Sequence, residues 1–235
     1  MVELSVVVPI YNETENIERL YKCITEAVMD KVAGYEIILV NDGSTDGTEH
    51  GLDKLASEDL HVEVIHFRKN CGQTAAIQAG IRKASGKYIA LIDADLQTDP
   101  NDFFTLLPYL AEFDFANGWR TKRKDTYLKK ISSRIGNGVR NWITGDVIED
   151  TGCPMKLFKR EVAESLQLYD GFHRFLPTLA RMNGYTVVEV PVSHREREFG
   201  ISKYGVMNRV FVGLMDAIVI GWLRKRAIRF EIRRE

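Results

Sequence analysis

The chain has 235 residues, 45% of them apolar and 28% charged, a composition typical of one large globular domain. Its net charge of -1 excludes proteins that bind nucleic acid through a strongly basic overall charge. Three isolated cysteines, Cys23, Cys71 and Cys153, form no CxxC pair, which indicates neither a zinc knuckle nor a disulfide framework and favours a reducing compartment.

The N-terminus, MVELSVVVPIYNE, has no basic lead and no small-residue cleavage site, so we expect a first strand there rather than a secretory signal. The longest apolar run, Val210–Leu223, is interrupted by Asp216. It is shorter than the ~20 residues of a membrane-spanning helix. We therefore expect no transmembrane segment.

Short apolar runs alternate with segments of helical periodicity through the first half of the chain. The runs predict strands at Leu4–Pro9, Tyr35–Val40, Val62–Phe67, Tyr88–Ile92 and Phe115–Trp119. The periodic segments predict helices at Asn12–Val28, Thr48–Ala56, Gly72–Ala84 and Asn101–Glu112, the last capped by Asp99 with Pro100 at its first position. This alternation indicates an α/β fold with a mainly parallel central sheet flanked by helices.

The second half of the chain is less regular. We expect a helix over Tyr127–Ile143 that carries Arg134 and Arg140, and a loop, a strand and a helix start in the segment EDTGCPMKLFKRE. Phe172–Asn183 and Asn208–Arg226 have helical patterns, and Thr186–Val190 reads as a strand. A basic loop, PVSHREREFGISKYG, precedes the last helix.

Polar clusters follow three of the predicted strands: YNE after the first, NDGS after the second and DADLQ after the fourth. In open parallel sheets, ligands bind at the carboxyl ends of the strands. Three clusters at one edge of the sheet therefore predict a binding site there.

Asp93 and Asp95 are two residues apart, so on an extended segment their carboxylates point the same way and can share one divalent cation. Gln97 adds a carbonyl oxygen. The alternative is a polar turn after a strand, with Asp99 capping the next helix.

Asp42 ends the second predicted strand, where its carboxylate can accept hydrogen bonds from a base N–H or a ribose hydroxyl. Gly43 permits close approach of the backbone. The alternative is a simple turn. The chain contains neither GxGxxG nor GxxxxGK[ST], which excludes the common dinucleotide fingerprint and the P-loop.

Four segments together resemble family 2 glycosyltransferases of the GT-A fold: VVVPIYNE, ILVNDGSTDGT, GQTAAIQAGIRKASGKYIALIDADLQ and HREREFGISKYG. Within that family they most resemble the dolichyl-phosphate mannosyltransferase-like branch, which loads a sugar onto a polyprenyl phosphate. The resemblance extends over about residues 4–210. It implies a nucleotide-sugar transferase.

The resemblance assigns roles to individual residues. It implies nucleotide contacts by Pro9, Tyr11, Glu13, Asp42, Gln73 and Asp93, and a Mg²⁺ or Mn²⁺ site at Asp93, Asp95 and Gln97. It implies action on the donor diphosphate and the acceptor phosphate by Asp95, Arg120, Arg134, Arg197, Ser202 and Lys203. The segment FANGWR departs from the Gly-Ser-Arg type segment of the branch, which leaves the role of Arg120 open.

The implied reaction is inverting transfer of a sugar, with mannose favoured, from GDP-mannose or a UDP-sugar to dolichyl or undecaprenyl phosphate. An ionised phosphate acceptor needs no general base, whereas a sugar hydroxyl does. One alternative is therefore transfer to a carbohydrate hydroxyl with Asp150 as the base, although Asp150 could instead anchor the following TGCP loop. Another alternative is a nucleotide-sugar-binding module without turnover. No nucleic acid partner is expected.

The chain is expected to divide into a catalytic domain, residues 1–203, and a C-terminal helix with a basic tail, residues 204–235. The helix combines an apolar face with Arg224, Lys225 and Arg226, a pattern typical of helices in the membrane interface. We expect a peripheral enzyme on the cytoplasmic face of the membrane. The same helix could instead pack on the domain, a membrane protein or a second subunit.

Overall fold

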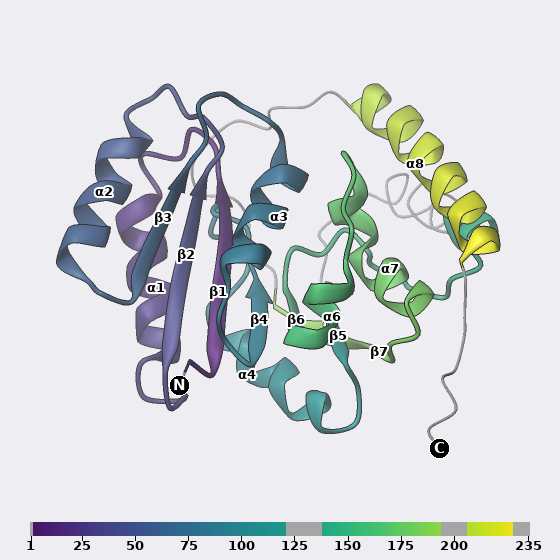
Figure 1. Ribbon diagram of the computed structural model, residues 1–235, viewed down its shortest axis with the longest axis horizontal. Helices are drawn as coiled ribbons and strands as arrows, with labels where there is room; N and C mark the ends of the chain where they lie inside the picture. The colour runs from purple at the N-terminus through teal and green to yellow at the C-terminus, as the bar shows by residue number, and fades with distance from the viewer. Residues whose placement is uncertain (1, 121–137, 194–205, 228–235) are drawn as a thin grey trace, which may run out of the picture.

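The computed structural model describes residues 2–120, 138–193 and 206–227, with side chains in the last range from Val212 onward (Figure 1). The predicted site residues Arg134, Arg197, Ser202 and Lys203 lie outside the described residues. So does most of the helix expected over Tyr127–Ile143, of which residues 138–144 are described and helical.

Seven strands of the described chain form one sheet in the order β3-β2-β1-β4-β6-β5-β7. The four strands β1 to β4 are parallel to one another, and β5 is parallel to β7. β6 lies between β4 and β5 and is antiparallel to both. The predicted mainly parallel α/β sheet is thus confirmed. The strands are β1 Leu4–Ile10, β2 Tyr35–Asn41, β3 Val62–His66, β4 Tyr88–Leu91, β5 Phe115–Arg120, β6 Lys156–Lys159 and β7 Val187–Val192.

Helices cover both faces of the sheet. The α-helices are α1 Ile17–Val28, α2 Thr48–Glu58, α3 Gln73–Lys83, α4 Phe103–Leu106, α6 Arg160–Ser165, α7 Leu176–Met182 and α8 Val206–Arg226. Three 3₁₀ turns are η1 Pro100–Asp102, η2 Leu107–Ala111 and η3 Phe172–Phe175.

Two predictions of single α-helices were wrong. The segment Asn101–Glu112 divides into η1, α4 and η2, and Phe172–Asn183 divides into η3 and α7. A proline lies in the first turn of the later element in each case, Pro108 in η2 and Pro177 in α7. Proline cannot donate to the preceding turn, so each helix restarts there. The cap was predicted correctly, because an Asp99 carboxylate oxygen accepts from the Asn101 N–H at 3.0 Å.

The core consists of two hydrophobic layers, one on each face of the sheet. In β1, Val6 and Val8 join the cluster that includes α1 and α4, whereas Val7 joins the cluster that includes α3, α6 and α7. This alternation follows from the period-two geometry of a strand buried on both faces. α3 packs so closely that a Cβ atom at Gly80 would overlap the Val7 side chain.

α8 lies at the end of the molecule opposite α1 and α2 (Figure 1). Its inward side carries Ala217 and Ile220, both buried, and Gly221, whose Cβ position would overlap the carbonyl oxygen of Ile143. Among the described helices, none combines the length and the apolar character needed to cross a membrane.

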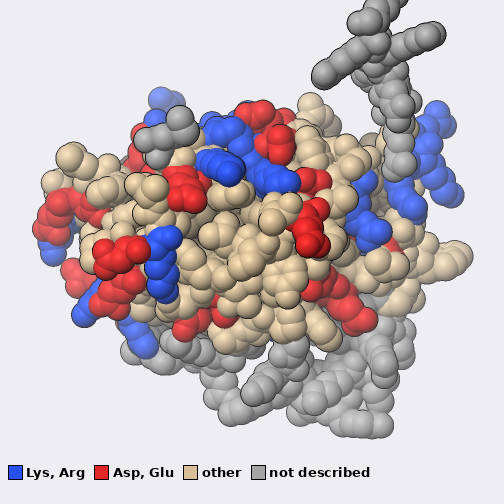
Figure 2. Space-filling view, turned by 90° about the horizontal axis from the view of Figure 1, so that it is seen from below, with Lys and Arg blue, Asp and Glu red and all other residues tan. Residues whose placement is uncertain are grey.

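Charged residues do not gather into one basic surface on the face seen in Figure 2. Over its described part, Lys and Arg are interspersed with Asp and Glu. The prediction that no nucleic acid partner exists stays a prediction, and this arrangement agrees with it.

Candidate functional site

The loops that follow β1 and β2 are tied together at the carboxyl edge of the sheet. Ile10 and Asn41, the last residues of the two strands, are paired in register. Just beyond them, the Asn12 N–H donates to Ser44 Oγ at 2.9 Å, and the Thr45 N–H donates to Asn12 Oδ1 at 2.8 Å. The predicted YNE and NDGS clusters therefore meet, and we call the polar edge that they form the rim. Tyr11 and Glu13 belong to the first of these clusters.

Asp42 is 3% exposed and holds a third segment of the rim. Its carboxylate accepts from the N–H groups of Cys71 at 2.7 Å and Gly72 at 2.9 Å, and from Asn70 Nδ2 at 2.9 Å. Burial raises the pKa of this carboxyl group, and the two backbone hydrogen bonds oppose the rise. A Cβ atom at Gly43, which has φ +67, would overlap the backbone of Lys69, so the close approach made there is to this loop. Contact of Asp42 with a nucleotide stays a prediction.

Asp93 and Asp95 follow β4 on a turn. Ala94 and Asp95 lie in a turn, Leu96 has φ +58, and the Gln97 N–H donates to Asp95 Oδ1 at 3.2 Å. The expectation of an extended segment from Asp93 to Asp95 was therefore wrong, whereas a cation shared by the two carboxylates stays a prediction. Pairing of β4 ends at Leu91, and the chain then bends through an aspartate-based turn.

The donor set at this turn fits a hard divalent cation. Carboxylate and amide oxygens of Asp93, Asp95 and Gln97 are ligands that Mg²⁺ and Mn²⁺ accept. Among the residues that the structure describes, no group of three His, Cys, Asp or Glu side chains could hold a metal by itself. A cation here would complete its coordination with substrate oxygens, as Mg²⁺ commonly does with phosphates.

Gln73, the first residue of α3, connects this turn to the loop held by Asp42. Its Nε2 donates to Asp93 Oδ1 at 2.8 Å. The three polar clusters and the start of α3 therefore form one continuous hydrogen-bonded rim. The sequence predicted its members, and the structure brings together Asp42 after β2, Asp93 after β4 and Gln73 at the start of α3.

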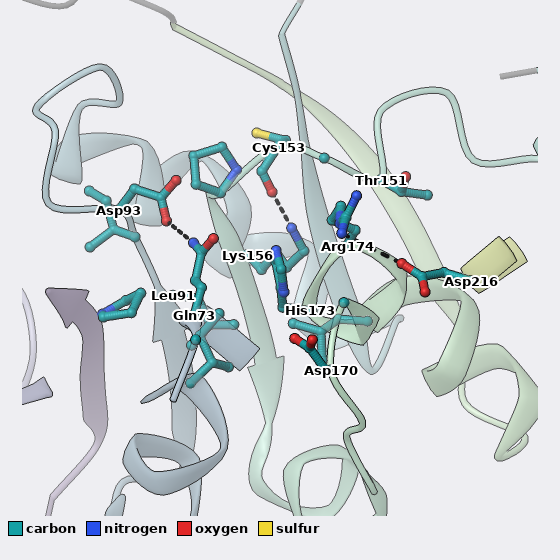
Figure 3. A pocket seen from close by; sticks show the side chains of 18 of the residues that line it. Gln73, Leu91, Asp93, Thr151, Cys153, Lys156, Asp170, His173, Arg174 and Asp216 are labelled. Carbon is teal, nitrogen blue, oxygen red and sulfur yellow. Dashed lines mark hydrogen bonds and ion pairs between the residues drawn. The ribbon is translucent and has the colours of Figure 1, made fainter. Parts of the chain in front are cut away.

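The rim opens onto a pocket of about 950 Å³ (Figure 3). Pro9, Gln73 and Asp93 line it, as expected for residues that contact a ligand. On the other side, the lining comes from β6, η3 and α8, through Lys156, His173, Arg174 and Asp216. This volume is within the range of small-molecule sites.

Lys156 is the buried cation of the pocket. It is 3% exposed, and its ammonium donates to the carbonyl oxygen of Cys153. Burial lowers the pKa of Lys156, and the negative charges of Asp150 and Asp93 oppose this shift. Sequence reasoning missed this residue, although a lysine inside the apolar run PMKLF was a signal.

The wall of the pocket opposite Asp93, called the far wall below, contains His173, Arg174 and Asp216. His173 Nδ1 lies 2.6 Å from Thr74 Oγ1, and burial, with the charges of Arg174 and Lys156, lowers the pKa of His173 to about 3, so its ring is neutral. Arg174 and Asp216 form an ion pair at 3.5 Å, and burial raises the pKa of Asp216. Asp216, which interrupts the apolar run of α8, therefore faces the pocket.

Arg120 has a partner other than a ligand. Its Nε and Nη2 donate to the two carboxylate oxygens of Asp150, each at 2.8 Å. Burial alone would lower the pKa of Arg120, but the hydrogen bonds and charge of Asp150 raise it. The Asp150 backbone carbonyl also accepts from Cys153 N at 3.2 Å, so Asp150 anchors the TGCP loop.

Comparisons with known proteins agree with this geometry. Residues 5–167 match the family described as Glycosyl transferase family 2. A dodecaprenyl-phosphate galacturonate synthase of Rhizobium johnstonii is 38% identical over 232 residues, which span 96% of this chain and 68% of the relative.

Solved structures share the fold. Glucosyl-3-phosphoglycerate synthase of Mycobacterium tuberculosis, with Mn²⁺ and uridine-diphosphate-glucose, matches with a TM-score of 0.68 at 21% identity, over 93% of this chain and 80% of that one. A mannosyltransferase of Pyrobaculum calidifontis, with GDP-Man and Mn²⁺, matches with a TM-score of 0.60 at 17% identity, over 96% of this chain and 74% of that one.

Proposed function

The chain belongs to glycosyl transferase family 2, and on that premise we propose that it transfers a sugar from a nucleoside-diphosphate sugar to a polyprenyl phosphate. The observation that carries the acceptor class is the identity with the dodecaprenyl-phosphate galacturonate synthase over nearly the whole chain. The Arg120–Asp150 pair supports it, because a carboxylate held at both oxygens is a poor base for a hydroxyl acceptor.

The proposed donor is a UDP-sugar. Solved structures that share the fold hold donors of both kinds, uridine-diphosphate-glucose in one and GDP-Man in another, so both belong to the test. Mannose, the sugar favoured by the resemblance, stays a prediction, and GDP-mannose belongs in any panel of donors.

The pocket explains how such a transfer would be assisted. Gln73 orients Asp93 at the rim, where the donor diphosphate would bind, and Lys156 lies in the wall of the same pocket. A divalent cation held by Asp93 and Asp95, with Gln97 beside them, would offset negative charge on the departing diphosphate. The ionised acceptor phosphate would attack in line and invert the anomeric carbon without a general base. Roles for Arg134, Arg197, Ser202 and Lys203 in holding the two phosphates stay predictions.

The outward face of α8 supports contact with a membrane. Exposed apolar side chains line it where a soluble helix carries polar ones: Val212, Leu214, Met215, Ile218, Val219 and Trp222. Trp142, 84% exposed, lies on the adjoining helical segment, and Arg224 donates to the Thr144 carbonyl at 3.0 Å where the two meet. An apolar surface beside basic residues suits a bilayer interface. We propose that this surface brings the pocket to its lipid acceptor.

The decisive experiment is mass spectrometry of the lipid fraction. The protein is incubated with Mn²⁺ or Mg²⁺, a polyprenyl phosphate in liposomes, and a panel of UDP-sugars and GDP-mannose. We expect one glycosylated polyprenyl phosphate, which Asp95→Ala abolishes and Asp30→Ala, at an exposed carboxylate after α1, leaves unchanged. Transfer to a soluble carbohydrate without a lipid product would contradict the proposal, and so would donor binding without any transfer.

Liposome flotation tests the membrane surface separately. Ile218→Asp and Trp222→Asp place charge on the exposed face of α8, so we expect protein to leave the liposome fraction. Leu60→Asp is the matched control, because Leu60 is fully exposed just before β3, away from α8. Equal flotation of all variants would exclude this surface.

A further inference from the structure

Lys156 differs from the other cations around the pocket in having no carboxylate partner among the described residues. Arg120 is held by Asp150 at 2.8 Å, and Arg174 is paired with Asp216 at 3.5 Å. The Lys156 ammonium donates only to the carbonyl oxygen of Cys153, a neutral group. Within the described part of the chain, Lys156 is therefore a buried amine without an ion-pair partner, and because burial lowers its pKa, its charged form is favoured when an anion binds next to it.

The Cys153 side chain does not balance that charge. Burial raises the pKa of its thiol, which is therefore uncharged at neutral pH. The nearby His173 is also neutral, and its lowered pKa is caused in part by the charges of Arg174 and Lys156. Neither neighbour therefore supplies a counter-charge to Lys156. Carboxylates of Asp93, Asp170 and Asp216 also line the pocket, but among the described residues Lys156 forms an ion pair with none of them.

A buried ammonium without a counter-ion is unfavourable, because desolvation is not repaid by an ion pair. Such a group is retained more readily where a ligand supplies the missing anion. Lys156 lines the pocket and is 3% exposed, so an anion that pairs with it would have to belong to a molecule that enters the pocket. The remaining question is which part of a donor or acceptor carries it.

The position of Lys156 favours the sugar. In Figure 3 it lies between Asp93 and Gln73 on one side and Arg174 and Asp216 on the other. If the donor diphosphate binds at Asp93, as proposed above, a sugar that extends from it into the pocket would approach Lys156. A neutral hexose offers only hydroxyl groups at this point, whereas a hexuronic acid offers a carboxylate at C6.

We propose that Lys156 binds the C6 carboxylate of a hexuronic acid, so that the donor is a UDP-hexuronic acid rather than a neutral UDP-hexose; this rests on the proposed function for the nucleotide end of the pocket. A charge-assisted hydrogen bond between ammonium and carboxylate is among the stronger polar contacts in proteins. Arg174, whose charge is offset by Asp216, borders the same end. The mannose prediction is the competing outcome.

The test compares two donors that differ only at C6, UDP-galacturonic acid and UDP-galactose. Their affinities are measured by calorimetry with Mn²⁺ present, for the wild type and for Lys156→Gln, which keeps a donor for the Cys153 carbonyl. We expect the wild type to bind the uronic acid at least about tenfold more tightly, and the ratio to approach one in the variant. Lys159→Gln, on the same strand but paired with Asp114, is the control and keeps the ratio.

Equal affinities in the wild type, or an unchanged ratio in Lys156→Gln, would overturn the inference. If Lys156 instead contacts the diphosphate, Lys156→Gln weakens the binding of both donors equally. If it contacts the acceptor phosphate, the affinity for neither donor changes. In both cases the ratio of the two donor affinities stays the same, which would also overturn the inference. Lys156→Arg keeps the positive charge and should keep the preference for UDP-galacturonic acid. It provides a second test if Lys156→Gln does not fold. The donor affinities are measured without an acceptor. A failure of lipid transfer would therefore refute the proposed acceptor without changing the interpretation of the donor affinities.

Discussion

Replacing Asp150 by Asn tests whether this carboxylate is an anchor or a catalytic base. The Arg120 and Asp150 side chains are 13% and 10% exposed and share two hydrogen bonds of 2.8 Å. The substitution removes the negative charge and replaces one acceptor by an NH₂ donor that faces the guanidinium. Arg120 is then left as a buried cation without its counter-ion.

Breaking a buried ion pair on one side costs about 3–5 kcal/mol, because the remaining charge is desolvated and unpaired. Asn keeps one oxygen that can accept from Arg120, so we expect the lower end, about 3 kcal/mol. For a domain of this size, each kcal/mol lowers Tm by about 2–4 °C, which gives a fall of about 6–12 °C.

The assay is urea unfolding followed by circular dichroism, with lipid transfer measured on the same preparations at a temperature where the variant is folded. Arg120→Gln/Asp150→Asn completes a double-mutant cycle, and we expect it to recover part of the loss because no unpaired charge remains. Glu63→Gln is the control, since Glu63 pairs with Lys83 on the surface and should cost less than about 1 kcal/mol.

Loss of transfer with an unchanged free energy of unfolding would refute this reasoning. That result would assign Asp150 to the chemistry and restore transfer to a hydroxyl acceptor. Loss of stability together with residual transfer by the folded fraction is the expected result.

Three further predictions concern the rim and the far wall of the pocket. His173 has a pKa of about 3 in the folded protein, whereas in the unfolded chain it is protonated below about pH 6.5. The free energy of unfolding should therefore decrease by up to about 1.4 kcal/mol for each unit by which the pH is lowered from about 6.5 to about 3. In His173→Gln, Tm should depend less on pH over this range. Gly171→Ala, at φ +82 and overlapping Asp216, should lower Tm more than Gly184→Ala, at φ +94 with open space; equal losses would mean that backbone strain alone matters. Asp42→Asn places an NH₂ group opposite the N–H donors of Cys71 and Gly72, so we expect the free energy of unfolding in urea to fall by about 2 kcal/mol. Calorimetry should also show weaker binding of a UDP-sugar to the variant. An unchanged affinity for the donor would mean that Asp42 does not take part in nucleotide binding.

The sequence by itself determined those parts of the protein that depend on local periodicity. Alternating apolar residues such as Val6, Val7 and Val8 specify a strand buried on both faces, and alternation with helices makes the sheet mainly parallel. Parallel strands bring their carboxyl ends to one edge, which is why Asp42 and Asp93 could be assigned to one site before any coordinates. The local pattern of apolar and polar residues was sufficient to predict the sheet and the edge at which these two carboxylates lie.

Only the tertiary structure decided which side chains face each other across the pocket. Lys156, Arg174 and Asp216 come from β6, η3 and α8, and no spacing in the chain relates them. Asp150 could be assigned to Arg120 only once β5 and the loop before β6 were placed side by side. Contacts of this kind depend on packing between distant segments, where burial decides the charge each group can carry and which partner it must have.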